Sequence, residues 1–392
     1  MPYYFSGSYS QPLKIRLNVD QLFSMYHEEK IIKQTIEYKR THPEYTAKIF
    51  MDSGAFSHFQ NAKKKGIVLT DKDVYEYTDK YLKFLNEWGD DLECFVGVDT
   101  VPDPNNVDPE AIKKTWANYL YMYERLKPSI RHKLIPVFHF GEDFEELKKW
   151  LEFRHPDGSK IEYLGLAISL EGVKKVRIAW GQECRRIIEA SSNPNVKTHA
   201  FGVGVKSVME HIDVTSTDAT SWLKRAAYGM ISVDDQSVYV SEIQESKSDG
   251  RHFKDKSTAF QETVLKRIKE GGFRLSPEVV PYKQEGDTFT FSCEDGDVTA
   301  VKEFNTLHVK FADKEVDYKE TDTVEGALHS WETKDKSFIT FNRNGTVSYD
   351  NSKCLATNCY ARAEFNILDT LAWYNNLTSK KHERKGEKVS LW

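Results

Sequence analysis

The sequence has no long hydrophobic run and few cysteines, and both shortages limit where the protein can work. No apolar stretch approaches the roughly 20 residues that a membrane-spanning helix needs. The opening residues lack the basic and then apolar order of a signal peptide. Five cysteines in 392 residues, an odd number, are not typical of a disulfide framework and fit a reducing compartment. We therefore expect a soluble cytoplasmic protein that binds no membrane.

A large excess of one charge is also missing. The formal net charge of −5 argues against binding nucleic acid through bulk charge, but it leaves room for a local basic surface. Basic clusters lie at 61–66, 172–177 and 379–388, although such clusters are more often solvated surface. No G-x-G-x-x-G opens a helical pattern, so the sequence does not indicate a dinucleotide-binding fold.

Between residues 45 and 235 the sequence repeats one order: a short apolar run, a turn of small residues and an amphipathic helical pattern. This alternation predicts a parallel sheet, either open or closed. Acidic residues at the carboxyl ends of several runs favour a closed barrel, because barrel enzymes place their chemistry there. The runs are "AKIFMDSGAF", "ECFVGVDTVP", "LIPVFHFGED", "IEYLGLAIS", "KTHAFGVGV" and "DVTSTDATSW".

After residue 235 this order stops, and strand-like alternation follows one helical pattern. Asn344-Gly345 lies between two alternating runs and predicts a hairpin with a tight primed turn. We place a barrel in residues 1–235, an inserted β-rich subdomain in 236–350 and a C-terminal helical segment in 351–392. That last segment is expected to pack back on the barrel and complete it.

Three aspartates lie at predicted strand ends: Asp52, Asp99 and Asp218. A carboxylate at such a position is partly desolvated and points into a shared mouth, which suits a nucleophile, a proton shuttle or a hydrogen-bond acceptor. A single aspartate beside Ser, Thr or Gly is more often a turn or a helix cap. Three at strand ends make the catalytic and the structural interpretations equally strong.

Glycines near the same mouth offer room for a flat ligand. Gly54, Gly165 and Gly202 would let a ring approach the main chain closely, although for any single glycine a tight strand-to-helix turn is the more common explanation.

Cysteine spacing near the end raises the question of a metal. Cys354 and Cys359 flank "LATN", and His382 follows 23 residues after Cys359, so two thiolates and an imidazole could share a zinc ion. A structural zinc site needs a fourth ligand, and reduced core cysteines with an exposed histidine are the alternative.

Taken in order, these stretches resemble the tRNA-guanine transglycosylase superfamily. "MDSGAF" matches the family's D-[ST]-G-G-F motif, "FVGVDTVPDP" resembles F-D-E-C-T-P, and "LGLAIS" resembles G-G-L-A-V-G. "HAFGVGV" is similar to L-M-G-V-G, "STDATSWLKRAAYG" to the nucleophile segment F-D-C-V-x-P-T-R, and the stretch from "CYARA" to the segment beginning Y-S-R-A-Y.

The sequence also departs from that pattern. Only Cys354 and Cys359 stand where the tRNA enzymes carry C-x-C-x-x-C, and "VFHFGED" replaces V-Q-G-G, which puts His139 or Phe140 near the glutamine position. "MDSGAF", "STDATSW" and the shortened cysteine set look most like the phage-type branch that inserts 7-deazaguanines into DNA.

The resemblance implies an irregular (β/α)8 TIM barrel and a base-exchange glycosyltransferase. On this interpretation Asp218 attacks C1′, Asp52 transfers the base proton and Asp99 recognises the purine. Cleavage of an N-glycosidic bond calls for two acids in any case, one to attack the carbon and one to handle the proton. The base-binding residues implied are Asp99, Ser53, Gly54, Phe56, His139, Gly165, Leu166 and Gly202.

The expected partners are DNA, or alternatively tRNA, and a free base such as 7-cyano-7-deazaguanine. The chemistry requires no cofactor, while zinc would be held by Cys354, Cys359 and His382. For a phage-encoded protein the compartment would be the host cytoplasm. Two other classes stay open: a nucleic-acid-binding barrel without catalysis, and a metal-dependent hydrolase using His139 and His199.

Overall fold

The computed structural model describes residues 2–7, 10–101, 108–168, 173–241, 250–323, 326–334 and 337–384, with side chains described as far as 379. The chain divides into two compact units, Met1–Ser221 with Trp373–Trp392, and Trp222–Ala372. Within the described ranges no helix combines the length and the apolar character that crossing a membrane requires.

The first unit is built on a parallel sheet of nine strands in the order β5-β4-β3-β2-β1-β9-β8-β7-β6. The first strand pairs with both β2 and β9, so the first and last strands of this sheet along the chain lie next to each other. The strands are β1 (Tyr3–Ser6), β2 (Gln21–Ser24), β3 (Ile49–Asp52), β4 (Cys94–Val96), β5 (Leu134–Ile135), β6 (Val137–His139), β7 (Tyr163–Ala167), β8 (Lys197–Ala200) and β9 (Ser216–Ala219).

The sheet curls into a nearly closed, barrel-like form. Its two edge strands, β5 and β6, follow each other in the chain with only Pro136 between them. Proline lacks an N–H, so the ladder is interrupted there. The carbonyls at the interruption still form hydrogen bonds with neighbouring strands. Ile135 O accepts from Gly97 N at 2.9 Å, and Pro136 O accepts from Gly165 N at 2.8 Å. The prediction of a barrel-like parallel sheet is confirmed at this level.

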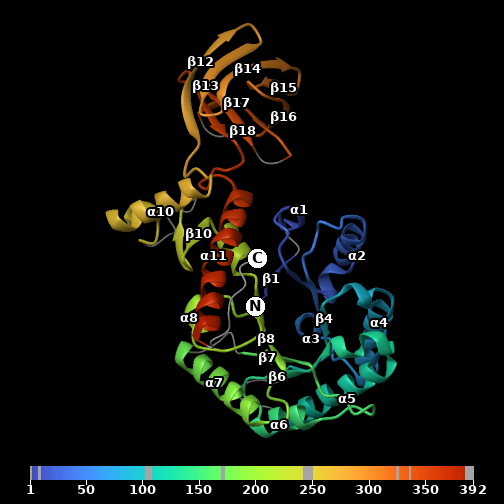
Figure 1. Ribbon diagram of the computed structural model, residues 1–392. Helices are drawn as coiled ribbons and strands as arrows, with labels where there is room; N and C mark the ends of the chain where they lie inside the picture. The colour runs from blue at the N-terminus through green and yellow to red at the C-terminus, as the bar shows by residue number, and fades with distance from the viewer. Residues whose placement is uncertain are drawn as a thin grey trace. The chain divides into compact units, whose positions relative to one another are not determined.

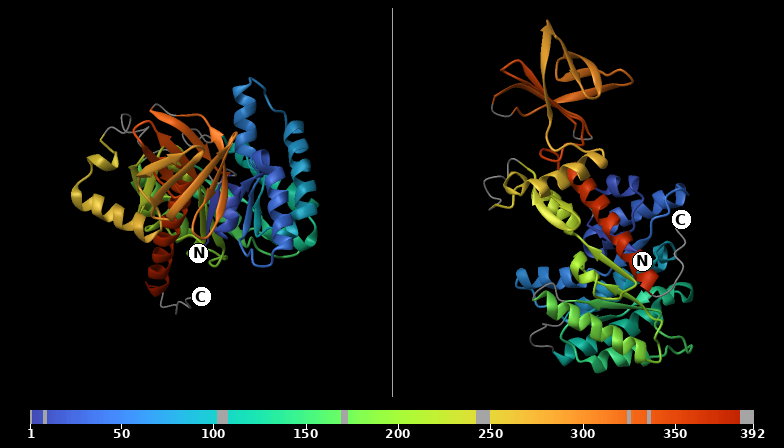
Figure 2. Two further views of the ribbon diagram at one scale, coloured as in Figure 1. Left: turned by 90° about the horizontal axis from the view of Figure 1, so that it is seen from above. Right: turned by 60° about the vertical axis from the view of Figure 1, so that its left-hand side comes forward.

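Helices alternate with the strands, as the sequence predicts, and Figures 1 and 2 show α4 to α7 on the outer side of the sheet. Local signals fix their starts: Thr70 and Asp73 form a capping box at α4, and Asp108 and Asp143 cap α5 and α6. The helices are α1 (Gln11–Arg16), α2 (Met25–Thr41), α3 (Ala55–Lys64), α4 (Asp71–Trp88), α5 (Pro109–Arg125), α6 (Phe144–Glu152), α7 (Lys174–Ala190) and α8 (Lys206–Met209).

The second unit contains a hairpin, one long helix, the first part of another and a β-barrel. The elements outside that barrel are α9 (Ser221–Ala227), β10 (Met230–Val233), β11 (Gln236–Tyr239), α10 (Thr258–Glu270) and α11 (Cys359–Arg384). Buried Asn366 on α11 accepts from Ser232 N at 2.7 Å and donates to Trp222 O at 3.0 Å. The two compact units meet in the sequence at Trp222 and Trp373, and β10 pairs with β11 across residue 236, while the predicted domain limits of 236 and 351 stay predictions.

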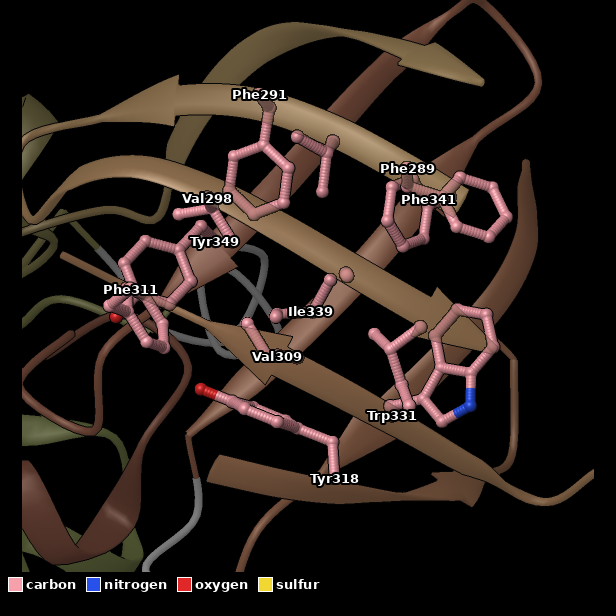
Figure 3. Close-up of a cluster of buried hydrophobic side chains, with 13 residues drawn as sticks. Phe289, Phe291, Val298, Val309, Phe311, Tyr318, Trp331, Ile339, Phe341 and Tyr349 are labelled. Atoms are coloured by element: carbon pink, nitrogen blue, oxygen red, sulfur yellow. The ribbon is translucent and has the colours of Figure 1, made fainter. Parts of the chain in front are cut away.

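Residues 278–350 form a closed antiparallel barrel in which each strand pairs with the next and β19 returns to β12. Alternate side chains point inward, as the period of a strand requires, and Figure 3 shows the aromatic rings that fill the interior, among them Phe289, Trp331 and Phe341. The strands are β12 (Glu278–Glu285), β13 (Thr288–Cys293), β14 (Gly296–Glu303), β15 (Thr306–Lys310), β16 (Glu315–Thr321), β17 (Ala327–Glu332), β18 (Phe338–Asn342) and β19 (Thr346–Asp350).

The predicted hairpin at Asn344-Gly345 joins β18 to β19, but its turn is longer than the two-residue primed turn expected. Gly345 N donates to Asn342 O at 3.2 Å, and only Gly345 in this turn has a positive φ, of 81°. A two-residue type I′ turn needs positive φ at both central residues, so the hairpin is confirmed and the turn type is corrected.

Candidate active site

A cavity of about 280 Å³ lies at the carboxyl ends of the parallel strands in the first unit. Parallel strands all end on one side of their sheet, so residues distant in sequence meet there. The lining residues are Leu22, Asp52, Phe56, Val96, Asp99, Val101, Val137, His139, Ala167, Ile168, Phe201, Gly202 and Asp218. The cavity therefore brings together the three strand-end aspartates and adds an apolar wall.

Asp218, in the middle of β9, is held by three hydrogen-bond donors. Its Oδ2 accepts from Ser6 Oγ at 2.5 Å, and its Oδ1 accepts from Gly202 N at 2.9 Å. His199 Nε2 lies 3.2 Å from the same Oδ1. Donors on both oxygens stabilise a carboxylate's negative charge and fix its orientation. Asp218 is only 8% exposed, and that exposed part faces the cavity.

Asp52 ends β3 and sits in a different environment. Its Oδ2 accepts one bond, from Gly54 N at 3.1 Å. Burial raises the pKa of Asp52 to about 7, the neighbouring negative charges of Asp99 and Asp218 add to the rise, and the Gly54 N–H opposes it. A carboxyl group with a pKa near neutrality both gives and takes protons readily, which is what acid-base catalysis needs.

His139 lies between two carboxylates. Its Nε2 is 2.7 Å from Asp99 Oδ2 and its Nδ1 is 2.7 Å from Glu142 Oε1. Burial lowers the pKa of His139, but hydrogen bonds and charge from Asp99 and Glu142 outweigh it and raise the pKa to about 9. The imidazole is therefore a cation at neutral pH, and it fixes Asp99 at the cavity wall.

Two phenylalanines provide aromatic surface at the cavity. Phe56, on the first turn of α3, is 55% exposed and lines the cavity. Phe201 follows β8, and its ring packs against Gly165, where an added Cβ would lie 2.5 Å from the ring. Gly165 thus acts through Phe201 and does not itself line the cavity.

The other predicted site residues support the cavity from behind. Ser53 is buried, its Oγ accepts from Ala55 N at 3.3 Å, and its carbonyl accepts from the Tyr77 hydroxyl. Gly54 has a φ of 73°, and a Cβ there would lie 2.6 Å from atoms of Ser24 and Tyr26. Leu166 is buried, and its carbonyl accepts from Phe201 N at 3.1 Å. These residues shape the turn and the wall.

Two of the three expected zinc ligands, Cys354 and Cys359, lie among the described side chains. Cys354 is buried and its Sγ lies 3.6 Å from Leu275 O, while Cys359 is half-buried at the start of α11. No group of three His, Cys, Asp or Glu side chains suited to a metal occurs in the ranges that the structure describes. The side chain of His382 lies outside the described residues, so zinc binding stays a prediction and no chemistry is assigned to it.

Sequence reasoning did not assign site roles to Ser6, Glu142 or Phe201, and it considered His199 only as a metal ligand. The sequence did hold one signal for His199. Alternate residues of a strand lie on the same face of a sheet, so His199 is expected on the face of Phe201, and Ser216 on the face of Asp218. Ser6 reaches Asp218 because β1 pairs with β9, a register that no local pattern reveals.

Comparison of the sequence with protein-family models and with curated proteins finds no match.

Proposed function

We propose that the protein is a base-exchange transglycosylase of the cytoplasm that replaces guanine in DNA with a 7-deazaguanine derivative. The observation that carries this proposal is the single cavity lined by Asp52, Asp99 and Asp218, in which the first and last aspartates have different hydrogen-bonding environments. We further propose that the parallel sheet is an irregular (β/α)8 barrel, in which β5 and β6 are one strand interrupted at Pro136.

In the first half-reaction Asp218 attacks C1′ of a deoxyguanosine. A bond forms between its carboxylate oxygen and C1′, the bond from C1′ to N9 breaks, and the electron pair leaves with guanine. Asp52, whose raised pKa of about 7 keeps part of the protein protonated there at neutral pH, gives its proton to the departing base. The product is a covalent glycosyl ester on Asp218.

In the second half-reaction the deazaguanine enters the vacated cavity. Asp52, now ionised, takes the proton from N9 of this base, and N9 attacks C1′. The ester bond breaks, Asp218 recovers its charge, and Asp52 is protonated for the next cycle. The two acids alternate without any external proton donor, so a pKa near neutrality for Asp52 suits both halves.

Asp99 is suited to recognise the purine. With Oδ2 bonded to His139, its other oxygen can accept from the N1–H and the amino group that guanine and 7-deazaguanines share. Phe56 and Phe201 offer faces for the ring. A cavity of about 280 Å³ admits one base and not a base pair, so the target nucleotide must be single-stranded or flipped from the duplex.

The test is incorporation of labelled guanine into polymer. The protein is incubated with labelled guanine and either duplex DNA or tRNA, and label retained by each polymer is counted. Label in DNA supports the proposal, and label in tRNA instead would favour the tRNA enzyme. Binding of DNA without labelling of either polymer would favour a non-catalytic barrel.

Asp218→Ala should abolish both exchange and the covalent adduct that denaturing gels detect on DNA. Asp313→Ala is the matched control, because Asp313 is exposed on the antiparallel barrel. Exchange by Asp218→Ala at the wild-type rate would overturn the assigned nucleophile.

A further inference from the structure

A line of hydrogen-bonded side chains runs through the inside of the parallel sheet and ends at Asp218. His199 Nε2 lies 3.2 Å from Asp218 Oδ1, and His199 Nδ1 lies 2.6 Å from Ser216 Oγ. Ser216 Oγ is in turn hydrogen bonded to the hydroxyl of Tyr163. His199 and Ser216 are fully buried and Tyr163 is 8% exposed, so water does not compete for these bonds.

The far end of this line lies at the opposite side of the sheet. Tyr163 is the first residue of β7, and its side chain lines a second cavity of about 440 Å³. The residues around that cavity come from the amino ends of the strands, and they include Lys48, Glu93, Lys133, Glu162 and Lys197. The four side chains thus span the sheet from its amino ends to the candidate active site.

The direction of each bond follows from the charge on Asp218. A carboxylate only accepts, so His199 must carry its proton on Nε2. Burial lowers the pKa of His199 against the opposing effect of Asp218, so the ring is neutral and Nδ1 has no proton. Nδ1 therefore accepts from Ser216, whose hydroxyl has one proton to give. Ser216 Oγ then accepts from Tyr163.

Burying these polar side chains costs free energy, which indicates that they have a function besides filling space. His199 lies between the rings of Phe50 and Phe201, with centroids 4.4 and 4.6 Å away. An imidazole and a hydroxyl among aromatic rings are stable only while every polar atom is paired, and apolar side chains would fill the space at less cost. What the polar side chains add is a fixed donor on Asp218.

We propose that His199 is a positioning residue for Asp218, held in its Nε2–H tautomer by Ser216 and Tyr163, so that the carboxylate is fixed for attack on C1′. The inference rests on the proposed function, because it assigns Asp218 the nucleophile's role. Without His199 the carboxylate keeps Ser6 and Gly202 but loses one of the two donors on Oδ1, which reduces the fraction of time that it spends aligned with the carbon.

The kinetic test uses the full-length protein with His199→Leu, His199→Gln, Ser216→Ala and Tyr163→Phe. In the exchange assay kcat should fall by up to about 100-fold for His199→Leu, while KM for DNA stays within about twofold, because only the aligned transition state is affected. His199→Gln should recover part of the rate, since its amide can donate. Ser216→Ala and Tyr163→Phe should show successively smaller losses.

Tyr119→Phe is the matched control, because the Tyr119 hydroxyl makes a buried 2.9 Å bond with His155 Nε2 that does not lead to Asp218. It should leave kcat unchanged. Wild-type kcat in both His199→Leu and Ser216→Ala would overturn the proposal, and so would an equal loss in Tyr119→Phe.

A second readout does not depend on activity. In protein labelled with ¹⁵N-histidine, the His199 ring signals, identified by their loss in His199→Gln, should show a neutral Nε2–H tautomer at pH 7. Ser216→Ala should weaken that preference. A Nδ1–H tautomer or an imidazolium would overturn the inference even if exchange occurs. Failure of the wild-type protein to exchange base, with the expected tautomer present, would overturn the proposed function and leave the hydrogen-bonded line established.

Discussion

The imidazole of His139 lies 2.7 Å from the carboxylate of Asp99. With Glu142 on its other nitrogen, the ring is a buried cation between two anions. Such an arrangement restrains the Asp99 carboxylate, and it makes the stability of the protein depend on pH in a defined direction.

The first prediction concerns that direction. The pKa of His139 is about 9 in the folded protein and about 6.5 when unfolded, so its contribution is complete below pH 6.5 and is lost as pH rises through 9. The difference in free energy of unfolding between wild type and His139→Gln should shrink by roughly 2–4 kcal/mol from pH 6.5 to 9.5. Urea unfolding at both pH values measures it.

His308→Gln provides the control for this series, because His308 pairs with Asp317 on the exposed surface. Surface pairs contribute little, so its difference from wild type should stay flat. Parallel behaviour of the two variants would contradict the role given to His139.

The second prediction concerns Asp52, which should also make the free energy of unfolding fall as pH rises. The pKa of Asp52 is raised to about 7 from 3.8, so its favourable contribution is present below pH 3.8 and is lost as pH rises through 7. Asp52→Asn should therefore be more stable than wild type at pH 8, by roughly 2–4 kcal/mol, and nearly equal at pH 4. A constant difference across these pH values in urea unfolding would contradict the raised pKa.

The third prediction concerns Phe56, which is 55% exposed at the cavity. Phe56→Ala should raise KM for the incoming base by about 5–100-fold, the range expected for one lost stacking contact. Its free energy of unfolding should change by less than about 2 kcal/mol, because more than half of the residue is already exposed. Phe56→Tyr keeps the ring and should restore KM. An unchanged KM in Phe56→Ala would exclude stacking.

The fourth prediction concerns the packing of Phe201, which lines the cavity, against Gly165. In Gly165→Ala the new Cβ would come within 2.5 Å of the Phe201 ring and push it into the cavity. Base binding should weaken at least tenfold, at a cost in stability of about 1–3 kcal/mol. Gly97→Ala is the matched control, since its Cβ would meet nothing closer than 3.6 Å. Titration of each variant with free guanine, followed by fluorescence, compares them.

The fifth prediction concerns the antiparallel barrel. Trp331 is fully buried there beside Phe341, whereas Phe304 is 95% exposed at the turn after β14. Trp331→Ala should lower the free energy of unfolding by about 3–5 kcal/mol, and Phe304→Ala should change it by less than about 0.5 kcal/mol. Thermal unfolding of the two variants tests whether the aromatic interior is the main source of the barrel's stability.

The sequence was informative where the fold and the candidate site depend on local order. Alternating patterns predicted the parallel sheet, and the rule that parallel strands end on one side brought Asp52, Asp99 and Asp218 together. Contacts that depend on the register between strands could not be predicted from the sequence. The contact between His199 and Ser216 depends on the alignment of β8 with β9, and closure of the antiparallel barrel depends on the pairing of Glu278 with Tyr349. Such alignments arise from packing of the whole chain.

The chain enters and leaves the antiparallel barrel at neighbouring points, which affects how the barrel could be removed or replaced. Arg274 and Cys354 form a bridge just outside the barrel, and Leu355 N donates to Arg274 O at 2.8 Å. The two connecting segments therefore run side by side, so a short linker could replace the barrel without separating the flanking helices α10 and α11. Such a module could be deleted or replaced as one cassette.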